Sequence, residues 1–214
     1  MIRKIFVFLS ASALLVAAGG ASAAGDPKAG KAKSELCQGC HGPDGMSVNP
    51  ECPNLAGQRG GYIIKQVVDF QKGLRNNDTM SAMAAMVTDV QDLKDIAAYF
   101  MTQTSMKGSA NMFGQSSGNK KTVAAGKEIF MNGNNNGAYG CVNCHGNGGK
   151  GKDPRNHIFP VLGGQSKDYI MKQLKDFKEG TRTNDPAGMM GDIAKKLSDS
   201  EIEAVADYLS SIDG

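Results

Sequence analysis

The sequence contains two copies of one segment, and this duplication limits the possible folds more than any other feature. The stretch 53–78 matches the stretch 160–185 at a constant offset of 107 residues. The matched pairs include Leu55/Leu162, Gly57/Gly164, Gln58/Gln165, Tyr62/Tyr169, Lys65/Lys172, Gln66/Gln173, Asp69/Asp176, Phe70/Phe177, Gly73/Gly180, Arg75/Arg182, Asn77/Asn184 and Asp78/Asp185. An internal repeat of this kind indicates one structural unit used twice. We therefore expect two similar domains.

A Cys-x-x-Cys-His motif precedes each copy, at residues 37–41 and 141–145. Covalent haem attachment needs two thiols that reach the vinyl groups and an imidazole held below the iron by the same turn. A redox disulfide or half of a zinc site are the alternatives. However, the βαβ setting of a redox disulfide is missing, and zinc does not explain a histidine after both pairs. The motifs predict two covalently bound haem c groups. The attachment residues would be Cys37, Cys40, Cys141 and Cys144, with His41 and His145 as iron ligands.

The first residues have the pattern of an export signal. Arg3 and Lys4 precede an apolar run, and Ala21-Ser22-Ala23 supplies a small-x-small cleavage site. This order predicts a signal peptide over residues 1–23, cleaved after Ala23. The alternative, an uncleaved membrane anchor, is disfavoured because the run is short for a bilayer. We expect an exported, soluble mature chain without a transmembrane segment.

The duplication divides the mature chain into two small domains. We expect an N-terminal domain over residues 24–103, a linker over residues 104–121 and a C-terminal domain over residues 122–214. The linker is rich in Ser, Gly, Asn and Gln and has no helical apolar pattern. Domains of this size have limited cores, and a large apolar haem would add buried surface. The formal net charge of only +3 and the absence of a basic block argue against a nucleic-acid partner.

Helical patterns recur in both halves, and no segment shows convincing β-alternation, so the predicted fold class is all-α. Asp26-Pro27 is typical of a helix start. Apolar residues from Tyr62 to Phe70 fall on one helical face, and Gly73 marks a stop. The closing helix of each half should begin with a capping box. These boxes would be Thr88 with Gln91 and Ser198 with Glu201.

The sixth iron ligand separates electron transfer from catalysis. An open iron site can bind oxygen or peroxide, whereas a Met–His pair closes the site and raises the potential. Met80 lies eight residues before Thr88, and Met190 lies eight before Ser198, so this pair of methionines recurs in both copies. We predict Met80 and Met190 as the axial ligands. Met83, Met86 and Met189 are the alternatives.

Other residues near the motifs have more than one interpretation. The carbonyls of Pro53 and Pro160 could orient the haem histidines, or these could be ordinary turn prolines. Arg75 and Arg182 could pair with haem propionates or be solvated helix-end charges. Cys52 is interpreted as a small buried thiol, with an intermolecular disulfide as the alternative. His157 is expected at the surface.

Two Cys-x-x-Cys-His motifs, each followed by Pro-x-Leu-x-Gly-Gln, resemble the dihaem cytochrome c4 family. The segments 65–73 and 172–180, which share Lys-Gln-x-x-Asp-Phe-x-x-Gly, are similar too. The resemblance implies a tandem pair of class I cytochrome c domains, related by a pseudo-twofold axis with haem propionates facing each other. Class I domains often have an aromatic residue in the first helix. Phe130 fits this pattern, but the first copy has Ser34, which predicts looser packing there.

The resemblance also implies periplasmic electron delivery from a quinol-oxidising cytochrome bc complex to a terminal oxidase. The protein would then be a carrier and not an enzyme. A dihaem subunit of a larger oxidoreductase, such as a sulfide-oxidising flavocytochrome, is the second hypothesis. A dihaem peroxidase is the third, and the methionine symmetry argues against it because a peroxidase needs an open haem site.

Overall fold

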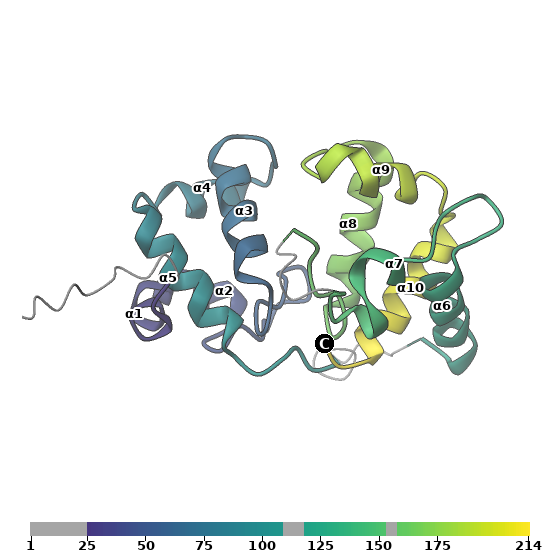
Figure 1. The fold of residues 1–214 in the computed structure, drawn as a ribbon, viewed down its shortest axis with the longest axis horizontal. Coiled ribbons are helices and arrows are strands. Elements are labelled where there is room, and N and C mark those ends of the chain that lie inside the picture. Colours follow the sequence, from purple (N-terminus) through teal and green to yellow (C-terminus); the bar gives the residue numbers. More distant parts are fainter. Residues whose placement is uncertain (1–24, 109–117, 153–157) are drawn as a thin grey trace, which may run out of the picture.

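The computed structural model of this chain describes residues 25–108, 118–152 and 158–214 (Figure 1). The regular elements of these residues are all helical, and they form two groups that lie side by side. The predicted all-α fold and the tandem arrangement of two domains are thus confirmed. The predicted signal peptide (residues 1–23) and His157 lie outside the described residues.

The N-terminal domain contains five helices. They are α1 (Pro27–Lys33), α2 (Glu35–His41), α3 (Gly60–Gln71), α4 (Asp78–Ala85) and α5 (Val90–Met101). As predicted, Asp26 caps α1, with Pro27 in the first turn. The apolar faces of α3 and α5 meet in a core of Ile63, Ile96, Ala97, Tyr99 and Phe100. The half-buried Cys37 packs against this core, so the first haem motif borders the apolar interior.

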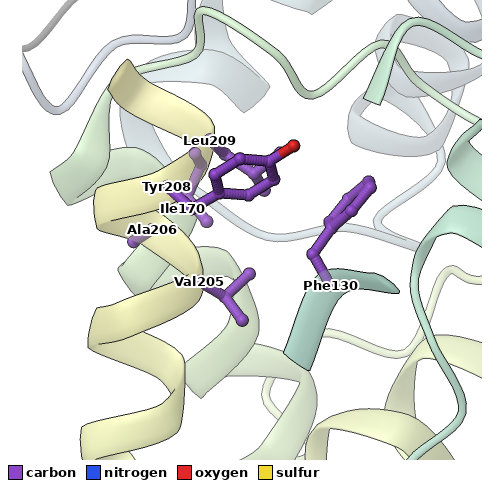
Figure 2. Close-up of a cluster of buried hydrophobic side chains, with 6 residues drawn as sticks. All are labelled: Phe130, Ile170, Val205, Ala206, Tyr208 and Leu209. Carbon is purple, nitrogen blue, oxygen red and sulfur yellow. The ribbon is translucent and has the colours of Figure 1, made fainter. Parts of the chain in front are cut away.

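The C-terminal domain repeats this plan with longer outer helices. Its elements are α6 (Lys120–Asn132), α7 (Val142–His145), η2 (Asn147–Gly149), α8 (Lys167–Glu179), η3 (Pro186–Gly188), α9 (Met189–Ala194) and α10 (Asp199–Ser211). Figure 2 shows the core between α6, α8 and α10, formed by Phe130, Ile170, Val205, Ala206, Tyr208 and Leu209. Helix α6 begins inside the predicted linker (104–121), because the Asn119 side chain accepts hydrogen bonds from the free N–H groups of Lys121 and Thr122.

The two closing helices begin with different caps. The predicted capping box of Ser198 and Glu201 is present at α10. The predicted box at Thr88 is wrong, because α5 is capped by Asp89, whose carboxylate accepts from the N–H groups of Gln91 and Asp92. Asp is a strong N-cap residue, and here it moves the helix start one residue along the chain.

In each domain the first helix crosses the last one at a glycine. A Cβ at Gly30 would lie 1.9 Å from the carbonyl oxygen of Asp95, and a Cβ at Gly126 would lie 1.8 Å from that of Ala204. Only glycine allows backbones to approach this closely. The crossing therefore brings α1 onto α5 and α6 onto α10 in the same way.

Two matched glutamines join the domains reciprocally. The Gln58 side chain bonds the backbone N–H and C=O of Val161, at 2.9 and 3.0 Å. The Gln165 side chain bonds the same two groups of Asn54, at 2.8 and 3.0 Å. Because both pairs are matched in the repeat, this exchange follows the pseudo-twofold axis. Met106, in the predicted linker, is fully buried beside it.

Candidate haem sites

The first Cys-x-x-Cys-His motif occupies the end of α2. Cys37, Cys40 and His41 all lie in this helix, and His41 is its last residue. Gly42 follows with φ of +80°, and a Cβ there would lie only 2.0 Å from the Met46 carbonyl oxygen. The sharp helix end leaves both thiols and the imidazole on one short helical segment.

The second motif has the same ending on a shorter helix. Cys141 precedes α7, and the His145 N–H donates to the Cys141 carbonyl at 2.9 Å. His145 is again the last helical residue, and Gly146 follows with φ of +74°. A Cβ at Gly146 would lie 2.5 Å from the backbone of Gly151. Each histidine is therefore held next to its cysteines by the same helix-plus-glycine unit.

Both haem-motif histidines are buried and oriented by a proline carbonyl. The Nδ1 atom of His41 lies 2.8 Å from the Pro53 oxygen, and that of His145 lies 3.0 Å from the Pro160 oxygen. A carbonyl can only accept, so Nδ1 carries the proton, and the prediction that these prolines orient the histidines is confirmed. Burial lowers the pKa of both imidazoles, although the proline hydrogen bonds oppose it. A neutral imidazole protonated at Nδ1 has its lone pair on Nε2, as a metal ligand requires.

The two thiols of each motif differ in their surroundings. Cys37 and Cys141 are half-buried against the apolar cores, whereas Cys40 and Cys144 are exposed. Burial raises the pKa of Cys37, and it raises the pKa of Cys141 to about 11. Paired thiols beside apolar side chains, with a neutral imidazole one position further on, fit the chemistry of a covalently bound haem.

The predicted axial methionines both lie in the first turn of a short helix. The Met80 N–H in α4 donates to Asn77 Oδ1 at 2.9 Å. The Met190 N–H in α9 donates to Asp185 Oδ2 at 2.7 Å. Both side chains are half-buried. Of the alternatives, Met83 is half-buried, whereas Met86 and Met189 are 61% and 39% exposed.

Arg75 and Arg182 lie buried at the domain interface, so their interpretation as solvated helix-end charges is wrong. Arg75 donates to Gln66 of its own domain (2.7 Å) and to Tyr169 (2.9 Å) and Gln173 (2.7 Å) of the other. Arg182 mirrors this with its own Gln173 (2.7 Å) and with Tyr62 and Gln66 of the first domain (both 3.2 Å).

This interface cluster carries positive charge in a buried setting. Each guanidinium lies over a phenylalanine ring of its own domain, Arg75 over Phe70 and Arg182 over Phe177. Although burial opposes ionisation, the nearby Arg182 and Arg75 lower the pKa of Tyr62. The hydrogen-bond partners of both guanidiniums are neutral side chains.

The sequence interpretation did not assign a role to Tyr62, Tyr169, Gln66 or Gln173, although all four are matched in the repeat. The available signal was their spacing. Polar residues at i and i+4 that recur in both copies of a helix indicate a polar stripe, and a stripe present in both copies fits a symmetric interface. In the described ranges there is no group of three or more His, Cys, Asp and Glu side chains placed to hold a metal ion. Among the described helices, none is long and apolar enough to cross a membrane.

Two helical domains that each contain a Cys-x-x-Cys-His turn with an oriented imidazole define a tandem c-type cytochrome. The family model for cytochrome c matches residues 27–104 and 123–213. The chain is 42% identical over 194 residues to cytochrome c4 of Pseudomonas aeruginosa, which covers 90% of this chain and 91% of that protein. It therefore belongs to the dihaem cytochrome c4 family, and it carries two covalently bound haem c groups and transfers electrons.

Other relatives agree with this assignment. The structure of reduced recombinant cytochrome c4 from Pseudomonas stutzeri matches with a TM-score of 0.77 and 37% identity, over 88% of this chain and 100% of that one. A thiosulfate dehydrogenase electron acceptor from Thiomonas intermedia is 34% identical over 98% of this chain and 91% of that protein. The structure of a thiosulfate dehydrogenase from Marichromatium purpuratum matches with a TM-score of 0.73 and 27% identity, over 87% of this chain but 40% of that chain.

Proposed function

We propose that this chain is a periplasmic carrier that takes electrons from a quinol-oxidising cytochrome bc complex and delivers them to a terminal oxidase by transient docking. It would act as a carrier and not as an enzyme. The observation that supports this most strongly is the recurrence, in both domains, of an oriented histidine together with a half-buried methionine at the start of a short helix.

In this proposal the thiols of Cys37 and Cys40 hold the first haem, with His41 and Met80 as iron ligands. Cys141 and Cys144 hold the second haem, with His145 and Met190 as ligands. When bound, each haem iron takes up and releases one electron. The chain contributes fixed ligands: Pro53 and Pro160 orient the imidazoles, while Asn77 and Asp185 fix the backbone at the two methionines. Closed coordination leaves no position for oxygen or peroxide.

The domain interface supports close coupling of the two haems. Arg75 and Arg182 are 9% and 8% exposed, and their guanidiniums bond neutral partners across the pseudo-twofold axis. A buried cation is stabilised by a nearby anion, and the family arrangement would bring the haem propionates to this interface. We therefore assign these arginines as counter-charges for the propionates.

The location and the domain limits are part of the same proposal. The pattern in residues 1–23 supports export, with cleavage after Ala23, so that the mature chain would begin with Ala24. The N-terminal domain would span residues 24–103 and the C-terminal domain residues 122–214. Edman sequencing of the protein from a periplasmic extract tests both the location and the cleavage site.

A spectroscopic redox titration of the purified holoprotein tests the proposed ligands. Two low-spin haems with a thioether–iron absorption band are expected. Met80→Ala and Met190→Ala should each remove about half of that band, because each would open one of two equivalent sites. Met83→Ala is the matched control and should leave the band intact. An undiminished band in Met80→Ala, or a high-spin haem in the unmodified protein, would contradict the assignment.

A second candidate function is electron acceptance from a sulfur-compound dehydrogenase, either as a free protein or as a subunit of a larger oxidoreductase. It is favoured by the relative from Thiomonas intermedia, which is named as the electron acceptor of thiosulfate dehydrogenase. Stopped-flow reduction distinguishes the two candidates. Fast reduction by a cytochrome bc complex and slow reduction by thiosulfate dehydrogenase supports the first, and the reverse supports the second.

A further inference from the structure

In each domain, one peptide unit makes a hydrogen bond on both of its sides. The Pro53 carbonyl accepts from Nδ1 of His41 at 2.8 Å, and the N–H of the same peptide unit belongs to Asn54. This N–H donates at 2.8 Å to Oε1 of Gln165, a residue of the other domain. A continuous line of hydrogen bonds therefore runs from His41 across the domain interface.

The second domain contains the same line in the opposite direction. The Pro160 carbonyl accepts from Nδ1 of His145 at 3.0 Å, and the N–H of that peptide unit belongs to Val161. This N–H donates at 2.9 Å to Oε1 of Gln58 in the first domain. Each glutamine thus contacts the peptide unit that orients the haem histidine of the opposite domain.

The amides of Gln58 and Gln165 are both held in one orientation. In each amide, Oε1 accepts a second hydrogen bond, at 2.9 Å, from the N–H of the next residue in the chain. Nε2 donates at 3.0 Å to a carbonyl of the opposite domain. Because the oxygen meets donors and the nitrogen meets an acceptor, the amide cannot be reversed without losing these bonds. Both glutamines are buried, so water does not compete with the oxygen for the N–H of the opposite domain.

The geometry allows one hydrogen bond in each line to strengthen the next. A peptide bond is conjugated, so an acceptor at its N–H increases the negative charge on its carbonyl oxygen. The more negative oxygen attracts the Nδ1 proton more strongly, and the imidazole becomes a more basic ligand at Nε2. His41 and His145 are buried, as are Asn54 and Val161, and a low local dielectric strengthens each bond of such a line.

We propose that Gln58 and Gln165 are positioning residues that set the basicity of the haem histidine in the opposite domain, each through a single peptide unit. The inference rests on the proposed function of His41 and His145 as iron ligands. A more basic ligand donates more charge and so favours the oxidised iron. Each glutamine therefore lowers the reduction potential of the haem in the other domain. The packing of the two domains on each other thus contributes to both potentials.

Variants of the glutamines in the complete holoprotein test this proposal through a crossed effect. Gln165→Met removes the acceptor at the Asn54 N–H with little change in volume. It should raise the potential of the first haem and leave the second unchanged, and Gln58→Met should do the reverse. A redox titration followed by haem-methyl NMR signals separates the haems, and Cys37→Ala, which removes one thioether of the first haem, assigns its signals. Equal shifts of both haems, or no shift, would overturn the proposal.

The histidine proton provides a second readout, independent of the potentials. With isotope-labelled histidine, the Nδ1–H signal of His41 in the reduced protein should move upfield in Gln165→Met, because its bond to Pro53 weakens. Gln165→Glu keeps an oxygen acceptor at the Asn54 N–H and should move the signal downfield. A purely structural role of the glutamine would weaken the bond in both variants, and an upfield shift in both would contradict the proposal.

Ser166→Ala is the matched control. The Ser166 hydroxyl donates across the same interface to the Pro50 carbonyl at 2.5 Å, whereas its backbone N–H bond to Gln165 is retained in alanine. This variant should leave the His41 signal and both potentials unchanged. A shift as large as that of Gln165→Met would show that loop packing sets the ligand, and the proposal would be wrong. Failure of the ligand assignment is seen separately, as a high-spin haem in the unmodified protein.

Discussion

In both domains the first helix crosses the last one in the same way, but different side-chain contacts stabilise the crossing. In the N-terminal domain the closure is ionic: Lys33 of α1 contacts Asp92 at 2.6 Å and Asp95 at 2.5 Å on α5. The Asp26 N–H also donates to Asp95, at 2.8 Å. In the C-terminal domain the closure is aromatic, because the fully buried Phe130 of α6 packs on Tyr208 of α10 with ring centroids 5.5 Å apart.

The difference follows from the lengths of the first helices. Helix α1 ends at Lys33, and Ser34 then leads directly into α2. Counted from the crossing glycines, Ser34 matches Phe130, but Ser34 is fully buried and hydrogen bonded to the Lys31 carbonyl and to Gln38. Helix α6 continues to Asn132, so Phe130 lies within it. The same helix crossing can therefore be stabilised either by ion pairs or by an aromatic pair.

The largest effect is expected from the aromatic closure. Phe130→Ala should destabilise the C-terminal domain by about 3–5 kcal/mol, because it removes a fully buried ring. Ser34→Ala at the matching position should cost only about 1 kcal/mol, through its lost hydrogen bonds. Denaturant unfolding of the holoproteins measures both. Equal losses would show that the two positions contribute equally to closure.

Substitution of either reciprocal glutamine, Gln58 or Gln165, should destabilise the domain interface to a similar extent, whereas the two helix closures should lose unequal amounts of stability. Gln58→Leu leaves the N–H and C=O of Val161 without partners, and Gln165→Leu does the same at Asn54. Unpaired buried groups cost about 1–3 kcal/mol each, so each variant, which leaves two such groups unpaired, should lose at least about 2 kcal/mol of interface stability. Calorimetry should then resolve two separate domain transitions. A single transition at the original temperature would contradict this role.

Asn77 and Asn184 are matched in the repeat but have different partners. Asn77 caps α4 next to Met80, whereas Asn184 crosses the interface to Gln66 at 3.0 Å and to Asp69 at 2.6 Å. Asn77→Ala should cost about 1 kcal/mol, as loss of an N-cap does, and should weaken the methionine band of the first haem alone. Asn184→Ala should loosen the interface and leave that band intact. The visible spectra of both variants during thermal unfolding check this, and identical behaviour would contradict it.

Acid should weaken the ionic closure and leave the aromatic closure unchanged, and this is the smallest expected effect. The Lys33 hydrogen bond, helped by the Asp26 N–H and Gln91, lowers the pKa of Asp95 to about 2. Because folding lowers the pKa of Asp95, the ionised carboxylate stabilises the fold at pH values above its ordinary pKa near 4. This stabilisation is lost as the pH falls toward about 2. The N-terminal domain should lose this contribution between these values, and Lys33→Met should flatten the dependence. A Lys33→Met profile that is unchanged between pH 4 and pH 2 would contradict the role of this ion pair.

Several parts of the molecule could be predicted because they depend on local chemistry. The haem motifs need only a helical turn, the Asp26 and Ser198 caps need only nearby N–H groups, and the repeat implied two similar domains. The cap at Asp89 was missed because two adjacent residues can both serve as caps and only backbone geometry selects one.

The sequence by itself determined the cofactor class, the duplication and the helical nature of each half, since these follow from residue type and spacing. Only the tertiary structure decided that Arg75 and Arg182 are buried at the domain interface and that Gln58 and Gln165 exchange hydrogen bonds between the domains. Each of these joins residues from separate segments. Their partners are set by how the two domains and their loops pack, and no local pattern encodes that packing.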